Sequence, residues 1–244
     1  MEKQFNPHLS VDCVIFGFDG DALKVLLIER VGTAGGPAGS GKHKLPGDLI
    51  IRFEDLDEAA KRILYELTGL ENIFLKQFHV FGSPDRIPPN SDKQWLEETS
   101  GVNITRVVTT AYYSLIRIDK SNTAHEDSHH ASWHDVNALP ELAFDHAEII
   151  SSGIEALRRE IKFEPICFEL LPKKFTIRQI QTLYEVIVGQ ALDNRNFRKK
   201  LLKAAYVEPL NEKQKGVAHK PAMFYRFNKK KYMAKRTEQL YYNF

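Results

Sequence analysis

The sequence predicts an α+β protein with two domains, an acidic domain of mixed strands and helices followed by a basic, mainly helical domain. The charge distribution is the first observation behind this prediction. Residues 171–236 contain 17 Lys and Arg against 4 Asp and Glu, whereas the rest of the 244-residue chain contains 17 against 28. The second observation is a change from strand-type to helical spacing of apolar residues beyond the Pro-containing segment 163–174. We therefore expect a first domain at 1–162, a linker at 163–172 and a second domain at 173–244.

The strands of the first domain are expected in apolar, β-branched segments. Residues 11–18 and 23–28 flank the turn Asp19-Gly20-Asp21, a pattern typical of a β-hairpin. Further strands are predicted at 73–81, 106–118 and 133–140. The connecting segments 32–42, 83–103 and 120–130 are polar or rich in Gly, Ala, Ser and Pro, and they are predicted to be loops.

Two helices are expected in the first domain. Residues 55–67 place six apolar side chains on one helical face, namely Leu56, Ala59, Ala60, Ile63, Leu64 and Leu67. Gly69 follows this helix as its C-cap. The second helix is predicted at 145–161, with Asp145 as its N-cap.

The second domain has the pattern of a winged helix-turn-helix. Apolar residues at helical spacing predict a helix at 177–187, which a glycine ends, and a second helix that opens at Asp193. Residues 223–227 alternate like a short strand, and Gly216 provides a tight turn, so residues 213–226 are expected to form the wing.

The start of the second of these helices is crowded with polar and basic residues, which favours DNA binding. Phe197, Leu201 and Leu202 are expected to face the core, which leaves the polar side chains outward. Recognition helices contact base edges through their N-terminal residues, with Arg reading guanine and Asn reading adenine. The residues predicted to bind DNA are Asn194, Arg195, Asn196, Arg198 and Lys199 on the helix and, at phosphates near the wing, Lys215, Lys220, Arg226 and Lys229.

The predicted partner of this domain is double-stranded operator DNA. Helix-turn-helix units usually pair across a two-fold axis, so a homodimer is expected. The alternative is a basic helical appendage that only solubilises the protein or packs on the first domain.

Residues 47–70 resemble the signature of the Nudix family. In that pattern an opening Gly is followed at fixed spacing by Glu, Arg-Glu, Glu-Glu and a closing Gly with an apolar residue, and the carboxylates hold magnesium beside a pyrophosphate. The matching residues in this chain are Glu54, Arg62, Glu66, Gly69 and Leu70. Gly47 lies one residue before the opening position, which is Asp48, and Ile63 and Leu67 occupy two positions where the family has glutamate.

The loss of those two carboxylates predicts that the domain no longer cleaves pyrophosphates. Magnesium requires oxygen ligands, and Glu66 alone offers it one carboxylate. Glu54 and Arg62 are expected to pair and to hold the preceding loop onto the helix. We therefore expect no catalytic residue, no metal and no cofactor. The alternative is a Nudix hydrolase of a nucleoside diphosphate derivative such as ADP-ribose, because some magnesium sites use only one or two carboxylates.

Together, the two domains resemble the Nudix-related transcriptional regulators. The resemblance covers about residues 8–236 and includes residues 80–88, with Gly82 and Asp85-Arg86, and the Leu-Ala-Phe-Asp-His segment at 142–146. The segments 183–185 and 193–200 look most like the arabinose-responsive branch from Bacteroidetes. The resemblance implies a Nudix-like α/β/α sandwich that senses a sugar or nucleotide-sugar effector, followed by a winged helix-turn-helix that binds DNA.

The resemblance also implies that the effector binds between the signature helix and the adjoining strands. The residues expected near this pocket are Arg30, Lys44, Glu66, Asp85, Arg86, Asp145 and His146. Carboxylates and Arg side chains are suited to sugar hydroxyls or phosphates, so a pentose or an ADP-ribose-like molecule is expected. The alternative for each residue is a surface charge or a helix cap. Two loops that border the pocket, 33–41 and 88–104, are longer than is expected in the family.

Composition narrows the remaining classes of protein. No run of about 18 apolar residues is present, so no membrane span is expected, and the polar N-terminus lacks the apolar core of a signal sequence. Cys13 and Cys167 both have apolar neighbours, which is typical of the reducing cytoplasm where we expect the protein. Four histidines, His125, His129, His130 and His134, have spacings that suit a metal site on a helix. Their segment is polar and loop-like, which disfavours that interpretation.

Overall fold

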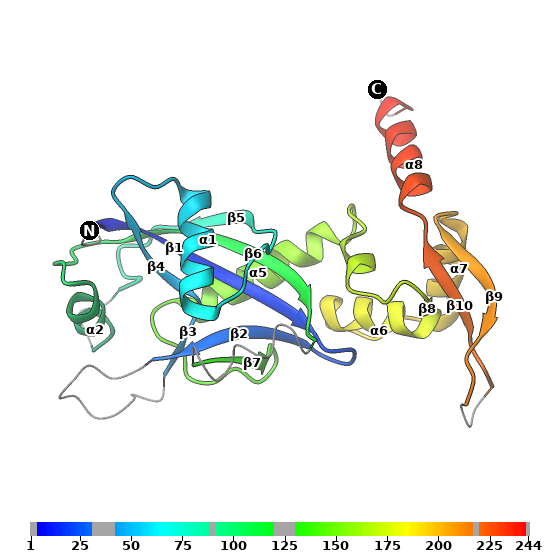
Figure 1. Cartoon of the computed structure of the whole chain (residues 1–244), viewed down its shortest axis with the longest axis horizontal. Coiled ribbons are helices and arrows are strands. Elements are labelled where there is room, and N and C mark those ends of the chain that lie inside the picture. Colours follow the sequence, from blue (N-terminus) through cyan, green and yellow to red (C-terminus); the bar gives the residue numbers. More distant parts are fainter. Residues whose placement is uncertain (1–3, 31–41, 88–90, 120–129, 217–219, 243–244) are drawn as a thin grey trace. The chain divides into compact units, whose positions relative to one another are not determined.

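The computed structural model describes residues 4–30, 42–87, 91–119, 130–216 and 220–242 (Figure 1). The chain divides into two compact units, residues 1–160 and 161–244. Among the described helices, none combines the length and the apolar character needed to cross a bilayer.

Within the described residues, the first unit contains a seven-stranded mixed sheet. Its strands are β1 (Phe5–Phe18), β2 (Leu23–Glu29), β3 (His43–Lys44), β4 (Gly47–Ile51), β5 (Lys76–Phe81), β6 (Val108–Arg117) and β7 (Ala131–Asp135). The main strand order is β3-β2-β1-β6-β5, with β4 beside β1 and β7 beside β2. β1 runs parallel to β6 and antiparallel to β2 and β4. The predicted hairpin around Gly20 is confirmed as β1 and β2.

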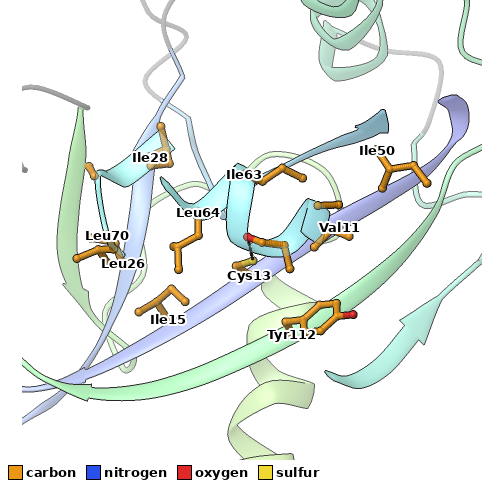
Figure 2. Packing of buried hydrophobic residues seen from close by; sticks show 13 residues of the cluster. Val11, Cys13, Ile15, Leu26, Ile28, Ile50, Ile63, Leu64, Leu70 and Tyr112 are labelled. Carbon is orange, nitrogen blue, oxygen red and sulfur yellow. Dashed lines mark hydrogen bonds between the residues drawn. The ribbon is translucent and has the colours of Figure 1, made fainter. Parts of the chain in front are cut away.

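Helices cover both faces of this sheet, α1 (Leu56–Thr68) on one face and α5 (His146–Glu160) on the other (Figure 1). The face toward α1 holds Val11, Cys13 and Ile15 of β1 together with Ala59, Ala60, Ile63 and Leu64 of the helix (Figure 2). On the opposite face, α5 brings Gly153 against Phe16, whose ring would lie 3.3 Å from a Cβ at that position. Successive side chains of a strand point to opposite faces, so β1 is apolar at both odd and even positions. The predicted α/β/α sandwich is confirmed.

Both ends of α1 are formed by capping residues that can be recognised in the sequence. The Asp55 carboxylate and the Glu58 side chain form a capping box at the start of the helix. Gly69 adopts a left-handed φ of 69°, and its N–H donates to the Tyr65 carbonyl oxygen at 2.8 Å. The predicted C-cap is therefore confirmed.

The structure corrects several predicted element boundaries. The segment 83–103, predicted to be a loop, contains the helix α2 (Ser91–Ser100). Helix α2 is largely polar and places Leu96 against a small apolar cluster that includes Ile104, so its sequence lacks the apolar period of a longer core helix. β1 begins at Phe5 rather than at 11, β5 begins at Lys76 rather than at 73, and β7 covers 131–135 rather than 133–140.

The second unit is a winged helix. Its elements are the 3-10 helix η1 (Ile166–Glu169), β8 (Phe175–Thr176), α6 (Ile177–Val188), α7 (Asn194–Lys203), β9 (Val207–Lys213), β10 (Met223–Phe227) and α8 (Lys229–Tyr242). The strands described in this unit form a sheet in the order β8-β10-β9. The antiparallel pair β9–β10 is the wing, so the predicted helix-turn-helix with a wing is confirmed.

The segment expected to link the domains contains η1. Cys167 and Phe168 are both buried, and the Phe168 ring stacks on the Phe227 ring of β10 with 4.3 Å between centroids. Burial raises the pKa of the Cys167 thiol to about 12, which leaves it protonated and unreactive at neutral pH. These residues thus belong to the core of the winged helix.

Candidate functional site

The signature segment is organised around the Arg62 side chain. Its guanidinium binds both carboxylate oxygens of Glu54, with Nε–Oε2 2.8 Å and Nη2–Oε1 2.5 Å, and it donates to Glu66 Oε2 at 3.0 Å. Glu54 also accepts a hydrogen bond from the Ile51 N–H at 2.6 Å, which ties the end of β4 to the helix. The predicted pairing of Glu54 with Arg62 is confirmed, and we call this group the Arg62 clasp.

The residues of the signature do not fit a divalent ion. Ile63 is fully buried in the core under α1 (Figure 2), and Leu67 packs against the same cluster. The two carboxylates that remain, Glu54 and Glu66, already bind a guanidinium. A hard cation such as magnesium needs several oxygen donors, and here the donors are either replaced by apolar groups or already bound to Arg62.

A cavity of about 510 Å³ opens beside the signature helix, and Leu67 forms part of its wall. Its volume lies within the range of about 300–1,000 Å³ that is typical of small-molecule sites. The wall residues come mainly from β1–β4, α2 and the start of α5. The ionisable side chains that line it include Asp12, Arg30, Lys44, Asp48, Arg86 and His146, and the aromatic ones include Trp95 and Phe144.

Arg86 connects two carboxylates in the cavity wall. Its Nε and Nη2 each donate to Asp145 at 2.9 Å, and Nη2 lies 3.5 Å from Asp12 Oδ2. The Arg86 side chain is only 4% exposed, and that of Asp12 only 6%. The Asp145 carboxylate therefore binds Arg86, and the backbone oxygen of Asp145 accepts the first hydrogen bonds of α5, from Glu148 and Ile149.

The His146 ring is held in one orientation by contacts at both of its nitrogen atoms. Its Nδ1 accepts a hydrogen bond from the Leu45 N–H at 2.9 Å, so the ring proton is on Nε2, which lies 3.4 Å from Asp12 Oδ1. Burial by itself would raise the pKa of Asp12, but His146 and Arg86 outweigh it and hold that pKa well below its ordinary value. Asp12 is therefore an ionised carboxylate inside the cavity wall.

Gly47 leaves the space that the Asp12 carboxylate occupies. A Cβ at position 47 would lie 1.9 Å from Asp12 Oδ1, which is closer than any real contact. Any side chain at this position would therefore displace Asp12 from Arg86 and His146.

Arg30 links α2 to the end of β2 through an ion pair. Its buried guanidinium binds Asp92 of α2 and lies 4.7 Å from the centre of the Trp95 ring. Asp92 also accepts a hydrogen bond from the Phe144 N–H at 3.2 Å. Although burial opposes ionisation of Asp92, the hydrogen bonds from Arg30 and Phe144 lower its pKa. Lys44 lies nearby, with Nζ 2.7 Å from the Gly47 carbonyl oxygen, and burial lowers its pKa.

The structure brings most of the predicted pocket residues together. Arg30, Lys44, Arg86 and His146 line the cavity, and Asp145 reaches it through Arg86. Glu66 instead belongs to the Arg62 clasp, and Asp85 is exposed; neither is among the lining residues.

Two lining residues, Asp12 and Trp95, were not predicted from the sequence, and neither was Asp92, which binds the lining residue Arg30. Asp12 could have been recognised from the sequence as a candidate site residue, because it is a lone carboxylate within the apolar run of β1. Asp92 and Trp95 lay in the segment predicted to be a loop. Within the described residues, no group of three or more His, Cys, Asp or Glu is placed to hold a metal. His125 and His129 lie outside the described residues.

In the winged helix, α7 presents a polar and basic surface. Arg195, Asn196, Arg198 and Lys199 are exposed on it. Asn194 is also exposed, and its Oδ1 accepts a hydrogen bond from Gln181 of α6 at 2.6 Å.

The apolar side of α7 is narrower than predicted. Leu201 is buried, and Phe197 packs edge-on against the Tyr184 ring with 5.5 Å between centroids. Leu202, which was expected to face the core, is 37% exposed because the helix turns it away from Leu201.

The wing carries further exposed cations. Lys215 and Lys220 lie near its tip, where Gly216 adopts a left-handed φ of 70°, and Lys229 is exposed at the start of α8. Arg226 is exposed on β10 and binds Glu208 of β9 at 2.9 Å.

Comparison with known families defines the class of protein. Residues 6–153 match the NUDIX domain, and residues 167–227 match the NrtR DNA-binding winged helix domain. The chain therefore belongs to the Nudix family and carries a DNA-binding winged helix of the NrtR type after its Nudix domain. This is the architecture of a DNA-binding transcriptional regulator.

Individual relatives extend this result. The chain is 29% identical over 226 residues to the ADPR responsive transcriptional repressor NtrR of Acinetobacter baylyi, across 91% of this chain and 82% of that protein. It is also 29% identical over 148 residues to the ADP-ribose pyrophosphatase of Methanocaldococcus jannaschii, across 61% of this chain and 76% of that protein. In fold it is similar to Shewanella oneidensis NrtR complexed with a 27mer DNA, with a TM-score of 0.68, 23% identity, and 92% of this chain and 95% of that chain covered.

Proposed function

We propose that the protein regulates transcription by binding operator DNA through α7 and the wing, under the control of a small effector that binds in the Nudix cavity. One observation carries this proposal. The Nudix domain keeps a cavity lined by buried, paired charges, although the carboxylates needed for hydrolysis are replaced at Ile63 and Leu67. Buried ion pairs are often no more stabilising than apolar residues of similar size, so stability alone does not account for their retention.

The charge balance of the cavity favours an uncharged polyhydroxyl effector. Asp92 binds Arg30, and Asp145 and Asp12 bind Arg86, so these two guanidinium groups are already neutralised. Sugar hydroxyls donate to carboxylates and accept from cations, whereas a diphosphate needs an excess of positive charge. Of the two effector classes that the resemblance implies, we therefore propose a sugar rather than a nucleotide sugar, which carries a diphosphate. A pentose is our first choice, in keeping with the resemblance to the arabinose-responsive regulators.

ADP-ribose is the second candidate effector. The Acinetobacter relative is described as ADPR responsive. The cavity volume of about 510 Å³ also falls in the range of sites for drug-sized ligands, which are larger than a pentose.

The DNA-binding arm of the proposal is tested by gel shift with the gene's own upstream region. Binding is expected at low salt, and its affinity should fall by about 0.9 log unit per log unit of salt for each phosphate neutralised. A triple variant, R195A/R198A/K199A, should lose binding, whereas the matched variant K61A/R159A, which removes exposed cations of the Nudix domain, should keep it. Absence of binding by the wild type at low salt contradicts the proposal.

The effector arm is tested by thermal unfolding with pentoses and with ADP-ribose. A ligand at about 100 times its Kd should stabilise the folded protein by roughly 2.7 kcal/mol. Trp95→Ala should abolish the shift, whereas Tyr65→Ala, at an exposed position on α1, should keep it. The effective ligand should then change the affinity for DNA, because an effector must bind the DNA-competent and incompetent states differently.

Hydrolysis is the alternative function, since the Methanocaldococcus relative is an ADP-ribose pyrophosphatase. We expect no magnesium-dependent turnover of ADP-ribose, because two carboxylates of the signature are replaced and Arg62 binds both of those that remain. Robust turnover that Glu66→Gln abolishes would replace our proposal with this one.

We further propose that the protein acts as a homodimer, because winged helices usually pair on two-fold half-sites. Light scattering on the complex with DNA should give two chains per duplex. A single chain per duplex would contradict the proposed dimer, but it would not affect the proposal that an effector binds in the cavity.

A further inference from the structure

Asn194, the first residue of α7, has its amide oxygen engaged inside the winged helix. The donor is Gln181 of α6, a side chain that is only 2% exposed. The Gln181 Nε2 atom lies 2.6 Å from Asn194 Oδ1 and 3.0 Å from the Leu192 carbonyl oxygen. It also lies 2.9 Å from Glu185 Oε1.

The chemistry of these neighbours determines which atom of Asn194 faces inward. A carbonyl oxygen and a carboxylate oxygen can only accept hydrogen bonds, so Gln181 must turn its nitrogen toward Leu192 and Glu185. The atom of Asn194 that meets this nitrogen must then be the oxygen. Rotating the Asn194 amide would bring two donors together beside the buried Gln181 side chain.

Glu185 completes this network. Its Oε1 also accepts a hydrogen bond from the Leu192 N–H at 3.0 Å. That bond and the one from Gln181 hold the pKa of Glu185 below its ordinary value, so it stays an acceptor at neutral pH. Gln181 and Glu185 are four residues apart and therefore share one face of α6. Through them, α6 holds both the turn that precedes α7 and the first residue of α7.

We propose that Asn194 is a positioning residue that fastens the start of α7 to α6, and that base reading falls to Arg195, Arg198 and Lys199. Recognition of adenine by Asn uses the amide oxygen and nitrogen together, and the oxygen of Asn194 is committed to Gln181. The three cations are exposed, and none of them forms an ion pair with another described residue. This inference rests on DNA binding by α7, which belongs to the proposed function.

The first test is selection of duplexes from a random-sequence library by full-length variants. Asn194→Asp keeps the acceptor oxygen and lacks the amide nitrogen, so it should enrich the same motif as the wild type. Asn194→Ala and Gln181→Ala should also keep the motif, but with similar losses of affinity for every sequence. Arg198→Ala is the matched control and should lose its preference at one base pair by about fivefold to a hundredfold, as expected for a base contact. If Asn194→Asp and Asn194→Ala both lose a preference for adenine at one position, the inference is wrong.

The second test needs no DNA. Amide hydrogen exchange in α6 and α7 of the full chain is compared for Gln181→Ala, Asn194→Ala and the double variant. Each single substitution already removes the hydrogen bond between Gln181 and Asn194. The double variant should therefore lose little more protection than the more affected single variant. Additive losses would overturn the positioning role. If the wild type enriches no duplex, the proposed function fails, and the exchange data still decide whether Asn194 is held by Gln181.

Discussion

The signature helix and the cavity beside it lie in the same domain, and they differ in the kind of side chain they keep. At the signature, Ile63 is part of the core, and the remaining charges form the Arg62 clasp nearer the surface. In the cavity, Asp12 and Arg86 are buried and paired. Buried charge requires good pairing to be tolerated. The signature thus has apolar side chains at two of its carboxylate positions, whereas a separate, costlier set of charges is buried in the cavity wall, and this contrast favours the proposed role as a sensor.

Removing one partner of the buried charge network should have the largest effect. Arg86→Met leaves Asp12 and Asp145 without their cation, and we expect the free energy of unfolding to fall by about 3–5 kcal/mol. Urea unfolding measures this loss. The matched control is Arg159→Met, at an exposed position of α5, which should change stability by less than about 0.5 kcal/mol. If Arg86→Met and Arg159→Met lowered the free energy of unfolding equally, the buried charges of the cavity would be no more important for stability than an exposed charge.

Breaking the Arg62 clasp should lower the free energy of unfolding by a smaller amount. The side chains of Glu54 and Glu66 are 13% and 36% exposed, so water can partly replace the guanidinium. Arg62→Met should therefore lower the free energy of unfolding by about 1–2 kcal/mol in the same assay. A loss as large as that of Arg86→Met would mean that the clasp is as costly to disrupt as the cavity network.

The charge on Asp12 should appear in the pH dependence of stability. Because its pKa is lowered in the folded protein, Asp12 contributes stability above its unfolded pKa, near 4. That contribution is lost as the pH falls through the folded value. Free energies of unfolding from urea curves between pH 6 and pH 3 should differ by a constant amount down to about pH 4. Below that pH, wild type and Asp12→Asn should converge, by at most about 1.4 kcal/mol per pH unit. A gap that stays constant below pH 4 would mean that the pKa of Asp12 is not lowered by folding.

The smallest effect is expected from restoring a carboxylate to the signature. Leu67→Glu changes a half-buried residue, so we expect a loss of about 1 kcal/mol in unfolding. No magnesium-dependent turnover of ADP-ribose should appear, because Arg62 still binds Glu54 and Glu66. Magnesium-dependent conversion of ADP-ribose to AMP and ribose 5-phosphate by this variant would show that one missing carboxylate was the whole defect.

The fold was predictable where local rules and periodicity agree. The core face of α1, its Gly69 cap and the pair of helices α6 and α7 all follow from apolar spacing and capping residues. Helix α2 did not, because it is largely polar and is held by tertiary contacts such as that of Asp92 with Arg30. Those two residues are 62 positions apart, and no local pattern joins them.

The candidate site was predictable only in part, for a similar reason. The Arg62 clasp spans eight residues and was expected from the signature. The contact between Asp12 and Arg86 spans 74 residues and depends on how the sheet and its loops fold together. The resemblance supplied Arg86 and His146, but it did not supply the carboxylate that they share.

The position of Trp95 has a practical consequence. The chain has two tryptophans, Trp95 in the cavity wall and Trp133 against the core under α1, and the winged helix has neither. Trp133→Phe would leave a single intrinsic fluorophore, 4.7 Å from the Arg30 guanidinium. Its emission would respond directly to a ligand in the cavity. A change in that emission on addition of unlabelled duplex would be an optical readout of communication from the winged helix to the Nudix cavity.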